Sequence, residues 1–263
     1  MGTYIEVIKK SFQQEYIYRA NTYISIFRNA IYLFISVSIW TSLFASKGAV
    51  DGVGLKDMIA YLVINLLIRN IIRSDASYII GDKVNSGEII TDLLKPVSFN
   101  FYMFSSQIGK NLYGTIFSTL PVCIIAMVFY GFTFPQNPVN VLLFLVTTFL
   151  GLILMYYIDY VSGLLSFWLK NGLYMDFFTG ALFEIFSGSS IPLWFYPDVL
   201  RNIGYILPFR LVTFEPVSIY LGKTSAAGAF DVILTQLIWI VGLVLLERFV
   251  WSRATKVVTI HGG

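Results

Sequence analysis

Charged and small polar residues inside an otherwise apolar run are the strongest candidates for function in this sequence. Glu184 lies within such a run and is followed by Ser187, Gly188 and Ser189. A carboxylate is costly in an apolar environment and usually faces water or the interior of a helix bundle, so these four residues are candidates for a polar route or outer gate. The alternative interpretation is a structural ion pair with a neighbouring helix, for which Arg28 is a candidate partner.

A second candidate group lies in the polar stretch between residues 81 and 102. Within it, a helix would place apolar and polar side chains on opposite faces and would end at Pro96. The apolar face would hold Ile89, Ile90, Leu93 and Leu94, and the polar face would hold Glu88, Thr91, Asp92 and Lys95. The pattern predicts a short amphipathic helix at about residues 83–96. One interpretation is a solvated loop that rests on lipid headgroups. The other is a helix that docks into a partner protein through Gly87, Glu88, Asp92, Lys95 and Pro96.

Catalytic and nucleotide-binding motifs are poorly represented. The segment Leu221-Gly222-Lys223-Thr224 resembles the end of a phosphate-binding loop, but Val217 occupies the position of the first glycine. The one histidine, His261, offers no triad or metal cluster, and the one cysteine, Cys123, permits no internal disulfide. We therefore expect no catalytic site and no metal or cofactor bound by this chain.

The composition indicates what kind of elements must position these residues. The chain of 263 residues is 57% hydrophobic and only 13% charged, with a mean hydropathy of +0.73. Soluble domains are about 45–50% apolar and about 25% charged. The net charge of +3 comes from basic residues beside apolar runs rather than from a basic stripe. The composition thus excludes a soluble enzyme, a nucleic-acid-binding protein and a disordered chain, and predicts an all-α polytopic membrane protein.

Hydrophobic periodicity divides this single domain, residues 1–263, into its elements. An amphipathic helix within residues 1–21 is expected to lie on the membrane surface. A six-helix bundle over residues 22–250 follows, and its candidate spans are 22–46, 57–79, 102–132, 139–168, 171–194 and 227–250. Glycines and prolines in residues 187–222 predict a broken outer segment, and residues 251–263 a cytoplasmic tail. We expect no cleaved signal peptide.

The distribution of basic residues predicts the orientation of the bundle. With the N-terminus in the cytoplasm, all but five of the 18 lysines and arginines lie on the inner side. The five on the outer side are Lys47, Lys56, Arg201, Arg210 and Lys223. Both termini are therefore predicted to be cytoplasmic, and the broken segment to face outward.

Three stretches carry a resemblance to a known family. They are Gly87-Glu88 with the run Leu93-Leu94-Lys95-Pro96-Val97-Ser98, the outer prolines Pro192, Pro197, Pro208 and Pro216, and the ending Ile260-His261-Gly262-Gly263. Together they resemble an ABC-2 type (type V exporter-like) transporter permease of the bacterial cytoplasmic membrane. The resemblance implies a surface helix before six membrane helices, a coupling helix after the second of them, and short outer helices before the last.

The resemblance also implies partners. It places ATP and magnesium in a separate ATPase subunit at the cytoplasmic face, in a complex of two permeases and two ATPases within membrane lipid. The chain would then be the permease subunit of an exporter for an amphipathic or lipid-like drug, peptide or glycolipid, working by alternating access. The alternative is a motor-independent secondary transporter or channel-like protein, for which inverted repeats and paired broken helices would be the signal.

Overall fold

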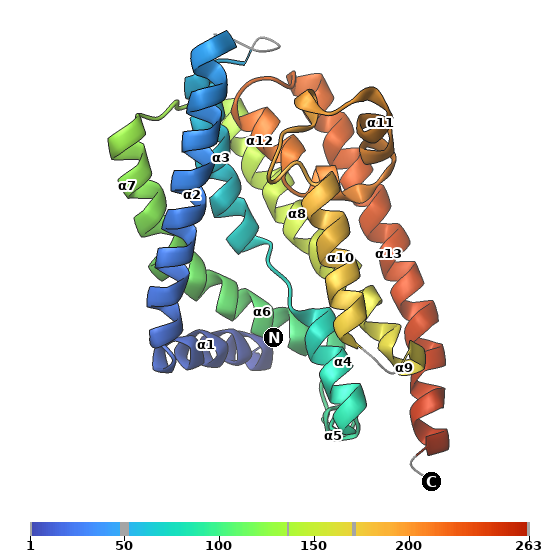
Figure 1. Ribbon diagram of the computed structural model, residues 1–263. Coiled ribbons are helices and arrows are strands. Elements are labelled where there is room, and N and C mark those ends of the chain that lie inside the picture. The colour runs from blue at the N-terminus through green and yellow to red at the C-terminus, as the bar shows by residue number, and fades with distance from the viewer. Residues whose placement is uncertain (1, 48–52, 136, 170–171, 262–263) are drawn as a thin grey trace.

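The computed structural model describes residues 2–47, 53–135, 137–169 and 172–261, and every regular element within these ranges is a helix (Figure 1). The α-helices are α1 Gly2–Ile17, α2 Ala20–Lys47, α3 Leu55–Ile71, α4 Ala76–Ser86, α5 Ile89–Leu93, α6 Phe99–Gly114, α7 Leu120–Tyr130, α8 Pro138–Leu164, α9 Ser166–Leu169, α10 Gly172–Phe186, α11 Asp198–Ile206, α12 Phe214–Tyr220 and α13 Ala226–His261. A π-helical turn, η1, spans Thr115–Thr119, and the 3₁₀ turns η2 and η3 span Leu193–Phe195 and Pro208–Leu211.

Four helical segments in the described part of the chain are long and apolar enough to cross a membrane. They are Ala20–Ala45, Phe99–Tyr130, Pro138–Leu169 and Ala226–Lys256, which correspond to the first, third, fourth and sixth predicted spans. The other two predicted spans are shorter than expected: α3 ends at Ile71 rather than near residue 79, and α10 ends at Phe186 rather than near 194. The 15 residues of α10 extend for about 22 Å, less than the roughly 30 Å of a bilayer core.

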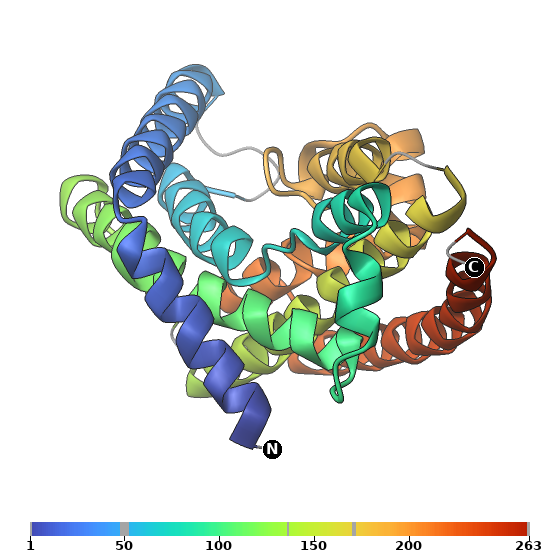
Figure 2. The same cartoon turned by 90° about the horizontal axis from the view of Figure 1, so that it is seen from below.

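Helix α1 lies across one end of the bundle, directly against α6 (Figures 1 and 2). The two backbones touch at Gly109, where a Cβ atom would collide with the carbonyl oxygen of Ile8. Beside this crossing, the hydroxyls of Ser11 and Ser106 form a hydrogen bond of 2.9 Å. The surface helix predicted within residues 1–21 thus ends at Ile17, and its inner face is fixed to α6 by a small-residue contact.

The predicted second span is two helices, because the chain breaks between α3 and α4. The Asn111 side-chain nitrogen Nδ2 donates to the carbonyl oxygens of Ile71 at 2.8 Å and Arg73 at 2.7 Å, which satisfies two groups at the break. On the other side, the backbone nitrogen of Ser77 donates to Oδ2 of Asp159 at 3.1 Å. Helix α4 then packs between α8 and α10 instead of continuing the axis of α3 (Figure 1).

A second irregularity is the π-helical turn η1 between α6 and α7. Pro121 has no N–H to donate to the carbonyl of Phe117 four residues earlier, which favours a widened turn at this point. The turn directs the hydroxyl of Ser118 toward α2, where Asn29 Nδ2 donates to it at 3.1 Å. The two polar residues are therefore satisfied inside the bundle.

Residues 187–222, predicted as a broken segment, hold four short elements between α10 and α13, which gather at the end of the bundle opposite α1 (Figure 1). Every residue of α12 is buried, so this segment enters the bundle instead of covering it as a loop. Gln236 of α13 fastens η3 by donating to the carbonyl oxygens of Leu211 and Thr147, both at 2.9 Å. The predicted tail from residue 251 is largely helical, since α13 continues to His261.

Candidate functional site

Glu184 forms an ion pair with Arg69, not with the predicted partner Arg28. Nη1 of Arg69 donates to Oε2 of Glu184 at 3.1 Å, and Nη2 of Arg69 pairs with Oε1. The hydroxyls of Ser189 and Ser190 donate to the same Oε2 atom at 3.3 and 3.0 Å. Glu184 lies two residues before the end of α10 rather than in the middle of a span. The pair therefore connects the end of α3 to the end of α10.

The break after Glu184 is held in place by α3 and by the outer segment. Gly188 has a φ of 76°, a left-handed conformation that favours glycine, and a Cβ atom there would meet side chains of Leu193 and Phe214. The hydroxyl of Tyr61 donates to the Gly188 carbonyl at 2.6 Å. The buried Ser187 uses its carbonyl to accept from Oγ1 of Thr213 at 2.6 Å. Ser187, Gly188 and Ser189 are thus a structural junction that positions the carboxylate.

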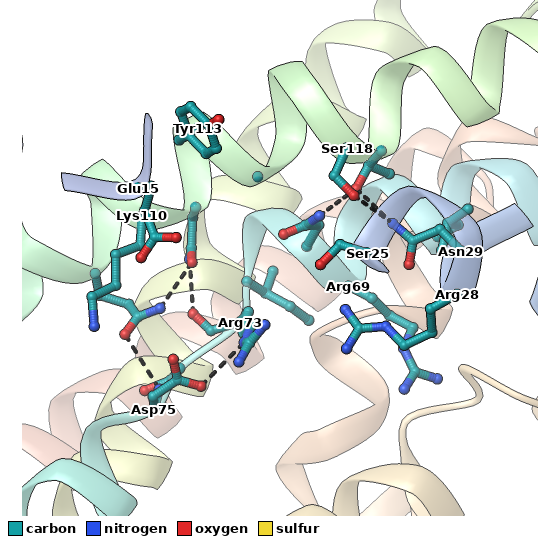
Figure 3. Close-up of a pocket in the computed structure, with 18 of the residues that line it drawn as sticks. Glu15, Ser25, Arg28, Asn29, Arg69, Arg73, Asp75, Lys110, Tyr113 and Ser118 are labelled. Carbon is teal, nitrogen blue, oxygen red and sulfur yellow. Dashed lines mark hydrogen bonds and ion pairs between the residues drawn. The ribbon is translucent and has the colours of Figure 1, made fainter. Parts of the chain in front are cut away.

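Beside this pair, a polar cavity of about 680 Å³ opens between α1, α2, α3, α6 and η1 (Figure 3). Its lining contains four cationic side chains, Arg28, Arg69, Arg73 and Lys110. In Figure 3, Arg28 and Arg69 are drawn toward one side of the cavity, and Arg73 and Lys110 toward the other. Polar side chains complete much of the lining, among them Ser25, Asn29, Asn70, Gln107 and Asn111. A cavity of this polarity inside a bundle of apolar helices is the feature best suited to hold a polar group.

The predicted docking helix of residues 83–96 is replaced by a helical hairpin. Residues 83–86 belong to α4, which ends at Gly87 with a φ of 78°, and α5 is only five residues long. Glu88 is exposed at the turn, and Pro96 is exposed after α5. The region therefore protrudes as the α4–α5 hairpin at the same end of the bundle as α1 (Figure 1).

The prediction that Asp92 lies on a solvated polar face is wrong. Its side chain is 4% exposed and pairs with both Lys83 of α4 and Lys95, whose Nζ lies 2.5 Å from Oδ1 of Asp92. Burial by itself would raise the pKa of Asp92, but the hydrogen bonds and positive charges of the two lysines outweigh it and lower the pKa from its ordinary value of 3.8. Leu94, predicted on the apolar face, is 80% exposed. The carboxylate therefore holds the hairpin closed, and a leucine is presented outward.

Sequence reasoning missed two contributors to these sites. The sequence counts Arg69 only among the basic residues of the inner side, whereas the structure shows it in the last turn of α3, facing Glu184 and the Tyr32 ring, whose centroid is 5.6 Å from its Cζ atom. The role of Lys83 could not be predicted, because its partner Asp92 lies across the turn between α4 and α5, which the helical periodicity did not reveal. An arginine inside an apolar run is itself a signal of function or pairing, and it would have pointed to Arg69.

Comparison with known families gives an independent result. Residues 30–262 match the family described as ABC-2 family transporter protein, so the chain belongs to the ABC-2 transporter family. A comparison with curated proteins finds no match. Members of the family are membrane-embedded transport subunits, generally non-catalytic, that function in ABC transporter systems with an ATPase partner. The all-helical fold and its four long apolar helices agree with this assignment.

Proposed function

We propose that this chain is the permease subunit of an ATP-driven exporter that moves an amphipathic or lipid-like substrate across the bacterial cytoplasmic membrane. Membership of the ABC-2 family is the observation that carries the proposal. A separate ATPase binds ATP and magnesium and contacts the end of the bundle that bears α1 and the α4–α5 hairpin. A second permease, identical or related, completes the pathway. A polar cavity and exposed apolar helix surface support an amphipathic substrate in this proposal.

In this proposal the α4–α5 hairpin transmits the movement of the ATPase. Its ion triad of Lys83, Asp92 and Lys95 makes α5 a firm extension of α4, and α4 packs against α8 and α10. A displacement of the hairpin would therefore reach the first part of α10, where the Ser77 hydroxyl of α4 donates to Oδ1 of Asp176 at 3.0 Å, and α10 carries Glu184 at its other end. The permease contributes no chemical step, and ATP hydrolysis in the partner drives alternating access.

Charge reversal at Glu88 tests the docking surface. Glu88→Lys should lower recovery of the ATPase in co-purification by about tenfold, because like charges brought together at an interface cost several kcal/mol. Glu88 is exposed and forms no side-chain hydrogen bond or ion pair in the described part of the chain, so the permease should remain folded. Asp231→Lys makes the same charge change at the opposite end of the bundle and is the matched control.

If Glu88→Lys co-purifies with as much ATPase as the wild type does, the hairpin turn is not part of the interface. Transport that continues in the presence of an ATPase variant unable to hydrolyse ATP would instead support the motor-independent transporter. The two measurements therefore separate the site of docking from the class of transporter.

The orientation is tested by single cysteines at Ser98 and Ala227 in a Cys123→Ala background. Both positions are exposed, and Ala227 avoids disturbing Lys223, which pairs with Asp57 at 3.1 Å. In intact cells, a membrane-impermeant maleimide should label position 227 only, and permeabilised cells should show both. Labelling of position 98 alone in intact cells would reverse the proposed topology.

A further inference from the structure

The cavity beside the Arg69–Glu184 pair carries an imbalance of charge. Its four cationic side chains face two lining carboxylates, Glu15 and Asp75. Asp75 pairs with Arg73, whose Nε lies 3.1 Å from Oδ1, and Arg69 pairs with Glu184. Positive charge is therefore left over in the lining.

Arg28 and Lys110 are the cations without a counter-ion. In the described part of the chain, neither forms an ion pair or a side-chain hydrogen bond, although Glu15 lies on the same side of the cavity as Lys110 (Figure 3). Arg28 lines the same cavity as Arg69, but the carboxylate of Glu184 is paired with Arg69 and not with Arg28. A cation without a counter-charge beside an apolar bundle is unfavourable, and a bound oxyanion would supply the missing negative charge.

The surroundings of Arg28 fit an anionic group that is attached to an apolar chain. Ile24, Ile31 and Ile35 lie on the same face of α2 as Arg28, at spacings of three to seven residues, and all three are exposed. Ser25, one turn before Arg28, lines the cavity and supplies a hydroxyl donor. A planar guanidinium is well shaped to hold the oxygen atoms of a phosphate.

We propose that this cavity binds a phosphate-type oxyanion at Arg28, with Lys110 adding positive charge from another part of the lining, and that the oxyanion is carried by an amphipathic molecule whose apolar part lies along α2. The inference rests on the proposed function, for which it specifies the charge of the substrate headgroup. An anionic lipid headgroup and free phosphate share the recognising chemistry, and the experiment separates them.

The test measures lipid binding by the full-length chain in phosphatidylcholine nanodiscs, without ATPase or ATP. Fluorescent short-chain phosphatidylglycerol and phosphatidylcholine are the two probes. The wild type should bind phosphatidylglycerol about tenfold more tightly, because charge-assisted hydrogen bonds form only with the net anionic headgroup in the site. The Arg28→Gln/Lys110→Gln variant should show no preference. Arg248→Gln, which removes a cation of α13 outside the cavity, should keep it.

Competition with inorganic phosphate identifies the source of the anion. Displacement of phosphatidylglycerol by millimolar phosphate supports recognition of the free oxyanion, and failure of displacement supports recognition of the headgroup together with its chains. Equal binding of both lipids by the wild type, or an unchanged preference in the double variant, would overturn the proposal. The motor-driven export proposal would be untouched, because the assay contains no motor.

A variant that keeps both cations tests whether loss of the lipid preference in the double variant is caused by misfolding. Ser25→Asp adds a carboxylate one turn from Arg28, where it should occupy the guanidinium and abolish the lipid preference. A preference that survives in Ser25→Asp as well as in the double variant would show that the cavity is not the anion site.

Discussion

Replacing Glu184 by glutamine should destabilise the protein by about 1–2 kcal/mol and reduce export. Loss of the carboxylate leaves the Arg69 guanidinium, whose side chain is 28% exposed, without a counter-charge between α3 and α10. Breaking a fully buried pair costs about 3–5 kcal/mol. The smaller figure applies here because the Glu184 side chain is 45% exposed. The apparent melting temperature of the purified protein and ATP-driven transport are the measurements.

The neutral double variant separates structure from function at this pair. Arg69→Gln/Glu184→Gln removes both charges and should recover most of the melting temperature. Transport that stays low in the recovered double variant would assign the pair a role in the route or gate, whereas recovery of both would leave it a structural tie. Asp198→Asn is the matched control, because it breaks an arginine–carboxylate pair in which Asp198 is 80% exposed. Wild-type melting and wild-type transport of the single Glu184 variant would contradict both roles.

Replacing Asp92 by asparagine should uncouple ATP hydrolysis from transport, the second large effect. The substitution leaves Lys83 and Lys95 facing each other with no anion between α4 and α5. Repulsion of the two ammonium groups should loosen the hairpin while the bundle stays folded. We expect about a tenfold fall in substrate moved per ATP hydrolysed, measured in proteoliposomes with the ATPase. Unchanged coupling would mean that α5 transmits nothing.

The same substitution has an expected pH dependence. The pKa of Asp92 is lowered on folding, so its stabilising contribution is complete above the ordinary value of 3.8 and is lost as the pH falls through the lower folded value. The difference in melting temperature between wild type and Asp92→Asn should stay constant from about pH 8 to pH 5 and shrink below about pH 4. Asp82→Asn, an exposed carboxylate of the same hairpin with no ion pair among the described residues, should give no such difference.

Local signals predicted the helical parts of the fold well. The helix break at Ser187 follows from Gly188 and Pro192, and the position of the surface helix follows from its apolar periodicity. The break between α3 and α4 could not be predicted in this way, since residues 72–75 contain neither glycine nor proline. It is held by Asn111 and Asp159, which are distant in the sequence.

The candidate sites were likewise predictable only where the signal is local in the sequence. Glu184 was found because a carboxylate in an apolar run is conspicuous, but its partner Arg69 lies 115 residues away and only the folded bundle brings them together. Helical periodicity placed Asp92 on a polar face and treated that face as solvated. It could not reveal that Lys83, on the preceding helix, covers the carboxylate. Pairing across elements is a property of tertiary packing, which single-helix patterns do not encode.

The π-helical turn at Thr115–Thr119 holds one residue more than an α-helical turn between α6 and α7. Each residue advances an α-helix by about 100°, so α7 faces α3 only because the wide turn accommodates its additional residue. Deleting one residue inside the turn would restore a regular helix and leave α7 facing as before, because the wide turn absorbs the additional residue. The same deletion at the start of α7 would instead turn every later side chain by about 100° and move the buried Val122, Cys123 and Ala126 away from the bundle. A change of one residue in length is therefore more tolerable in the turn than in the helix that follows it.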